Sequence, residues 1–81
     1  MLTASDNDHR SRASGELDQV AATLDAFVVA LRARKCKAAN VLLLQANKHL
    51  ARAFTELTSI ENRMEVSLRY QELHAAVNGA V

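Results

Sequence analysis

The sequence predicts an all-α fold, a helical hairpin with one short and one long helix that dimerises into a four-helix bundle. The 81 residues include no proline and two glycines, whereas β folds need such turn residues at every corner. Large apolar residues recur at alternating spacings of three and four, which is typical of an amphipathic helix. The second run of this pattern is the longer one, so its helix is expected to overhang the first.

Residues 1–14 are expected to form a flexible N-terminal tail, and residues 15–81 the helical hairpin domain. The tail has Leu2 as its one large apolar side chain and shows no periodicity. Such a segment buries too little apolar surface to offset the entropy lost on ordering.

The first helix is expected to begin near Ser14, whose hydroxyl can cap an exposed backbone N–H. Glu16 and Asp18 follow in the first turn, where the helix dipole favours negative charge. The apolar seam then consists of Leu17, Val20, Leu24, Phe27 and Leu31. It ends there because the next seam position holds Arg34, which does not belong in a dry core.

A turn between the two helices is predicted at about residues 35–40. Basic residues lie before it, at the negative pole of the first helix, and Asn40 is a suitable N-cap for the second. The alternative is one unbroken helix through this stretch, because no glycine or proline marks a stop.

The second helix is predicted to run from about 41 to 77. Its seam repeats every seven residues, at Leu43, Leu50, Leu57 and Met64. The alternative is a break at Thr58–Ser59, which begins a capping-box pattern and would give three helices. Asn78 and Gly79 tolerate the left-handed conformation that often ends a helix.

The distal half of this long helix, about 59–77, is apolar but has no partner within the predicted hairpin. Burying each large apolar side chain is worth roughly 1.5–3 kcal/mol, so another chain is expected to cover this half. A homodimer is the commonest solution, and a protein target is the other. The predicted dimerisation or partner-binding residues are Ile60, Met64, Val66, Leu68, Tyr70, Leu73 and Val77.

Charge is segregated along the chain, although the net charge is only +1. Residues 1–31 carry −3, residues 32–52 carry +6 with no acidic residue, and residues 53–81 carry −2. The predicted electrostatic patch at the turn consists of Arg32, Arg34, Lys35 and Lys37. Three interpretations are open for it: solvation of helix ends, steering of an acidic protein surface, or contact with nucleic-acid phosphates.

No pattern in the sequence predicts catalysis. Cys36 between two lysines is expected to be a plain surface thiol, although His49 is a conceivable base for it. His9, His49 and His74 have no metal-ligand spacing, and no glycine-rich loop is present to hold a phosphate. We therefore expect no enzyme activity, no metal and no cofactor.

The sequence is that expected of a cytoplasmic protein without membrane association. It has no signal-peptide pattern, its longest apolar run is Ala26–Leu31, and a single cysteine fits a reducing compartment. The expected function is a protein–protein interaction module, a regulator, inhibitor, adaptor or co-chaperone that packs helices onto a target. The alternative is a regulator that binds nucleic acid through the basic turn at residues 32–37.

Overall fold

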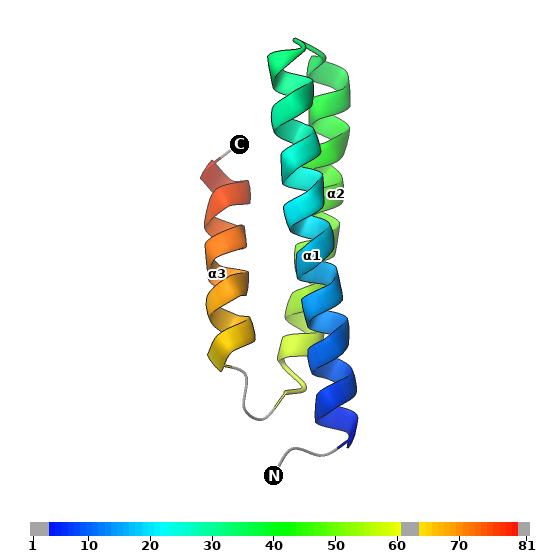
Figure 1. Ribbon diagram of the computed structural model, residues 1–81, viewed down its shortest axis with the longest axis vertical. Coiled ribbons are helices and arrows are strands. Elements are labelled where there is room, and N and C mark those ends of the chain that lie inside the picture. Colours follow the sequence, from blue (N-terminus) through cyan, green and yellow to red (C-terminus); the bar gives the residue numbers. More distant parts are fainter. Residues whose placement is uncertain (1–3, 61–63, 80–81) are drawn as a thin grey trace.

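The computed structural model describes residues 4–60 and 64–79, which form three helices and no strand (Figure 1). They are α1 (Ala4–Arg32), α2 (Cys36–Leu57) and α3 (Met64–Gly79). The molecule is elongated, with extents of 48 × 17 × 14 Å. The predicted all-α class is confirmed, but the chain folds as three helices rather than as a hairpin of two.

Helix α1 begins at Ala4, so the flexible tail predicted for residues 1–14 is wrong for the described part, and Ser14 lies inside a helix. Ala13 is fully buried, and the His9 side chain bonds Glu56 near the end of α2. A helix that has already nucleated extends at low cost, so a few contacts suffice to keep this polar segment helical. Residues 1–3 lie outside the described residues.

The first turn comes at residues 33–35, earlier than predicted, and Asn40 lies within α2 rather than capping it. Helix α1 ends in a Schellman motif, in which Lys35 N–H donates to Ala30 O (2.9 Å) and Arg34 N–H to Leu31 O (2.9 Å). Arg34 takes the left-handed position of this motif, with φ of 59°, where glycine is usual. These bonds satisfy carbonyls at the end of α1 without any glycine.

The predicted single helix over 41–77 is wrong, because α2 ends at Leu57 and the chain turns at residues 58–60. The alternative break at Thr58–Ser59 is confirmed in position but not in mechanism. Thr58 is the C-cap of α2, and its hydroxyl donates to Thr55 O (2.7 Å). Glu61, the acidic residue that would complete the capping box begun by Thr58, lies outside the described residues.

Helix α3 folds back along the hairpin and packs against both α1 and α2 (Figure 1). The main core joins leucine, valine and alanine side chains of all three helices with Ile60 of the second turn. Its buried members are Ala13, Leu17, Val20, Ala46, Leu50, Ala53, Leu57, Ile60, Val66 and Val77. A smaller cluster of Phe27, Ala30 and Ala39 lies nearer the first turn.

The three helices differ in length, and this difference shapes the surface. Helices of 29, 22 and 16 residues are about 43, 33 and 24 Å long, respectively. Helix α3 stops short of the first turn (Figure 1), so the part of the hairpin next to this turn consists of α1 and α2 alone. We call this part the turn end and the other part the three-helix end.

Helix α3 also removes the argument that a second copy must cover the distal apolar half. A continuous helix would overhang its partner, whereas the chain turns back and covers this half itself. Helix α3 continues to Gly79 through the predicted Asn78–Gly79 stop, and no described glycine has a positive φ.

Candidate interaction surface

The structure divides the predicted dimerisation residues between the core and the surface. Ile60, Val66 and Val77 are buried, and Tyr70 and Leu73 are partly buried against the same core. The stripe of Val66, Tyr70, Leu73 and Val77 therefore faces the hairpin of its own chain. Met64 and Leu68, one turn apart on the outer face of α3, are 73% and 56% exposed.

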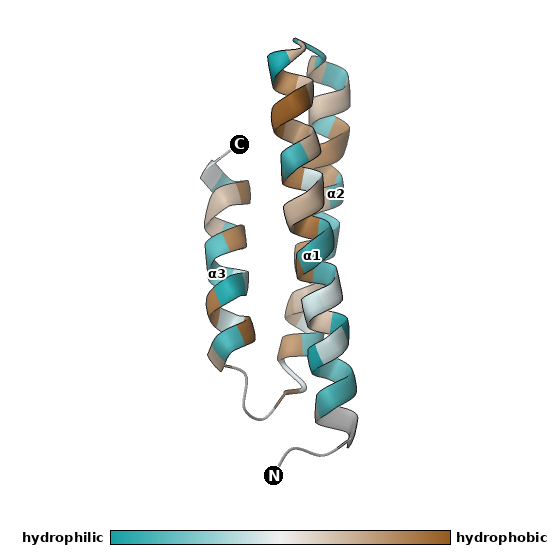
Figure 2. Cartoon of the chain, in the orientation of Figure 1, coloured by the Kyte–Doolittle hydropathy of each residue, from teal (hydrophilic) through white to brown (hydrophobic). Residues whose placement is uncertain are grey.

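A larger set of exposed apolar residues lies at the turn end. Figure 2 shows hydrophobic residues on both arms of the hairpin beyond the end of α3. The large hydrophobic side chains exposed there are Val28, Val29, Leu31, Val41 and Leu44. Leu31 was predicted to lie in the seam of the first helix, and this set of residues was not predicted to form a surface.

Leucine side chains seven residues apart on α1 differ in exposure according to whether α3 covers them. Leu17 is fully buried, Leu24 is partly buried, and Leu31 is 49% exposed. The same happens on α2, where Leu57 and Leu50 are buried but Leu43 is only partly buried. Because each series keeps one helix face, the exposed members continue the face that α3 covers at the three-helix end.

On α2 this continuation is hollowed. A cavity of about 350 Å³ is lined by Asn40, Leu43, Leu44 and Asn47. Asn40, Asn47 and Phe54 lie seven residues apart and therefore share one face of α2. Phe54 contacts Tyr70 of α3, with ring centroids 5.9 Å apart, so the cavity lies on a face that α3 contacts further along the helix. We define the turn-end groove as this cavity together with Val28 and Leu31, which follow Leu24 by one and two turns of α1.

The predicted electrostatic patch forms the edge of the turn end. Arg32, Arg34, Lys35 and Lys37 are all exposed around the first turn, and none forms an ion pair with another described residue. From residue 26 to residue 55 the chain has six basic and no acidic residues. The four residues, which we call the basic rim, therefore give this end a positive potential.

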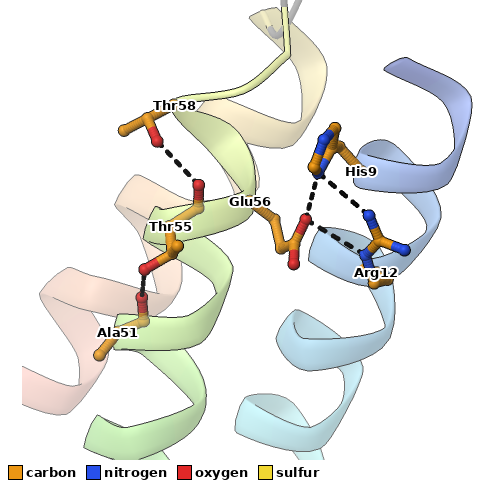
Figure 3. Close-up of polar contacts among 6 residues, drawn as sticks. All are labelled: His9, Arg12, Ala51, Thr55, Glu56 and Thr58. Carbon is orange, nitrogen blue, oxygen red and sulfur yellow. Dashed lines mark hydrogen bonds and ion pairs between the residues drawn. The ribbon is translucent and has the colours of Figure 1, made fainter. Parts of the chain in front are cut away.

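The three-helix end has the opposite arrangement, because its charged groups pair across helices. His9 Nδ1 lies 2.5 Å from Glu56 Oε2, and Arg12 Nε lies 3.3 Å from the same oxygen (Figure 3). The hydrogen bond from His9 holds the pKa of Glu56 below its ordinary value, and Arg12 contributes in the same direction.

A second histidine–glutamate pair joins the same two helices, with the acidic residue on α1 and the histidine on α2. Glu16 of α1 accepts from His49 of α2 at 2.5 Å, one heptad along from His9 and Glu56. Asp18 of α1 pairs with Arg69 of α3 at 2.5 Å, with both side chains exposed to solvent. Glu16, Asp18 and Glu56 are therefore engaged within the chain.

A smaller cavity of about 220 Å³ separates α2 from α3 at the three-helix end. Its lining residues are Phe54, Leu57, Thr58, Ser67, Tyr70 and Gln71. The Tyr70 ring also stacks on His74, with centroids 5.6 Å apart, and Asn78 contacts the same imidazole. His74 is thus held at the exposed edge of the bundle.

The residues considered for catalysis do not meet. Cys36 is exposed at the start of α2, and His49, thirteen residues later on the same helix, is about 20 Å away along its axis. His49 instead pairs with Glu16. Among the described residues, no group of three or more histidine, cysteine or acidic side chains is placed to hold a metal ion.

Within residues 4–60 and 64–79, no helix is both long enough and apolar enough to cross a bilayer. In comparisons with protein-family models, curated proteins and solved structures, nothing matches this chain.

Proposed function

We propose that this chain is a non-enzymatic protein–protein interaction module that acts by packing helices onto a partner protein. One observation carries the proposal: apolar side chains stay exposed along a groove whose other half is filled by a helix of the same chain. Leu31 and Leu44 are 49% and 63% exposed, and fully burying such a side chain is worth roughly 1.5–3 kcal/mol. Regulation, inhibition, adaptation and chaperoning are all compatible with this mode of binding.

Self-association belongs to the same proposal, since a second copy is one kind of protein partner. The outer face of α3 offers Met64 and Leu68, and the turn end offers the groove. Two chains packed through their turn ends would form a four-helix bundle from α1 and α2 of each copy, whereas two chains packed through α3 would not. Sedimentation at micromolar concentration measures this directly, and a dimer that Met64→Glu with Leu68→Glu dissociates would assign the outer face of α3.

The proposal is tested by affinity capture of the full chain expressed in its own cells. We expect one protein to co-purify in a stoichiometric amount. Val28→Glu with Leu44→Glu, or Met64→Glu with Leu68→Glu, should abolish its recovery while the helical circular dichroism remains. Val29→Glu is the matched control, because Val29 is 64% exposed and lies about 100° around α1 from Val28. Recovery of the same proteins with every variant, or of none with any form, would contradict the proposal.

The second candidate function is nucleic-acid binding through the basic rim. It is favoured by four exposed cations within six residues, without an ion pair in the described part of the chain. Binding of random duplex DNA should then weaken steeply with salt, and Lys35→Ala with Lys37→Ala should flatten that dependence. Absence of binding at low salt would remove this candidate.

A further inference from the structure

We infer that the turn-end groove binds an acidic amphipathic helix of a different protein, which lies in line with α3 against the hairpin. This inference rests on the proposed function and names the face and the chemistry of the partner. It draws on three features: the continuity of the groove, the residues that line it, and the charge around it.

The occupant is a helix because the groove already accepts one. At the three-helix end, α3 lies in the channel between α1 and α2 and buries Val66 and Val77 there. The exposed Leu31 and the partly buried Leu43 continue the same faces of α1 and α2 beyond α3. A second helix at that level would restore the three-helix packing of the rest of the molecule.

The residues of α3 indicate what such a helix presents. The face that α3 turns to the hairpin has spacings of four, three and four, at Val66, Tyr70, Leu73 and Val77. The turn end is shorter than the three-helix end, so two or three apolar residues at this spacing would fill it. Asn40 and Asn47 flank Leu43 and Leu44 in the cavity and offer amide groups to a polar side chain at its edge.

The positive charge of the turn end favours an acidic helix from a different protein. The basic rim lies at the end of the groove, and acidic side chains on the bound helix would face it. A second copy bound through the same face on a two-fold axis would instead bring two stretches of residues 26–55 together, both without acidic residues. Contact between the groove and the acidic end of a second copy would be head-to-tail, which builds rings or filaments and not the common two-fold dimer. Of the acidic side chains at that end, Glu16, Asp18 and Glu56 also have partners within their own chain.

The test uses the full chain and a synthetic helical peptide of about 15 residues, roughly four turns. The peptide has leucine at the spacing of the buried face of α3 and glutamate at flanking positions. A matched peptide has lysine in place of every glutamate. Titration calorimetry should show binding of the glutamate peptide that weakens with salt, and at least ten-fold weaker binding of the lysine peptide.

Two substitutions one residue apart locate the binding site. Val28→Glu should weaken binding of the glutamate peptide at least ten-fold, because Val28 follows Leu24 on the groove face. Val29→Glu makes the same change in charge on another face of α1 and should change affinity less than two-fold. Both side chains are already exposed, 42% and 64%, so circular dichroism should show folded protein in each case.

Several results would overturn the inference. Equal affinity of Val28→Glu and wild type would mean that the peptide had displaced α3 and had not bound the turn end. Equal binding of the two peptides would remove the role of charge, and displacement of the peptide by random duplex DNA would assign the basic rim to phosphates. A dimer that Val28→Glu dissociates would assign the groove to a second copy.

The failure of this inference is distinguishable from the failure of the proposed function. If the glutamate peptide does not bind, yet a co-purifying protein is lost with Met64→Glu and Leu68→Glu, the proposed function stands and the assignment of the groove is wrong. If no protein co-purifies in a manner that depends on either face, the proposed function is itself wrong.

Discussion

The two ends of the molecule are built from the same pair of helices but differ in what covers them. At the three-helix end, Leu17 and Leu50 are buried beneath α3, and charged groups of α1 pair with those of α2 and α3. At the turn end, Leu31 and Leu44 are exposed and the charged groups are all basic. Leu17, Leu24 and Leu31 share one face of α1, so an unchanged heptad pattern serves as core or as surface according to the reach of a third helix.

The largest expected difference between the two ends lies in the cost of removing a leucine. Leu50→Ala should destabilise the fold by about 3 kcal/mol, because Leu50 is 3% exposed and the substitution leaves a cavity in the core. Leu44→Ala, on the same helix, should cost less than about 1 kcal/mol, because Leu44 is already 63% exposed. Urea denaturation followed by circular dichroism measures both, and equal costs would contradict the division into two ends.

A smaller effect of opposite sign is expected at the first turn. Arg34 has φ of 59°, a conformation that costs a residue with a Cβ about 1 kcal/mol and glycine almost nothing. Arg34→Gly should therefore stabilise the protein by up to about 1 kcal/mol. Arg32→Gly is the control, because Arg32 belongs to the last turn of α1 and glycine there should destabilise the helix. If Arg34→Gly melted at a lower temperature than wild type, the left-handed conformation of Arg34 would not be a cost to the stability of the protein.

The smallest of the three effects concerns acid at the three-helix end. The folded state lowers the pKa of Glu56, so Glu56 binds a proton less readily in the folded than in the unfolded chain. Its stabilising contribution is complete above its ordinary pKa of 4.5 and is lost as the pH falls through the lowered value. Denaturation at a series of pH values should show that Glu56→Gln loses this acid dependence, while Glu72→Gln, at an exposed position of α3, keeps it.

The helical class, the seams of α1 and α2 and the basic turn were predictable, because each depends on local spacing or on charge. The break at residues 58–60 was harder, since Leu43, Leu50, Leu57 and Met64 keep one heptad phase across it. One signal was present: the buried stripe moves to a new face at Val66. Two stripes on one helix are better explained as two helices that each bury one face.

The helical start of α1 was not predictable from hydrophobicity. Its stability depends on contacts with residues nearly fifty positions away, such as that of His9 with Glu56, and on the burial of Ala13. The candidate surface was missed for a related reason, because exposure of Leu31 depends on where α3 ends. Sequence spacing identifies which residues share a face but does not determine how far another helix extends along it.

The single cysteine gives this chain a built-in point of attachment for a spectroscopic reporter. Cys36 is exposed at the start of α2, beside the basic rim, and the sequence contains no other thiol. A maleimide dye would therefore label one known position without any substitution. Its emission would report events at the first turn, whereas the ring of Tyr70, the one tyrosine, is placed to report on the contact between α2 and α3. Two colours would thus follow the two ends of the bundle separately in one sample.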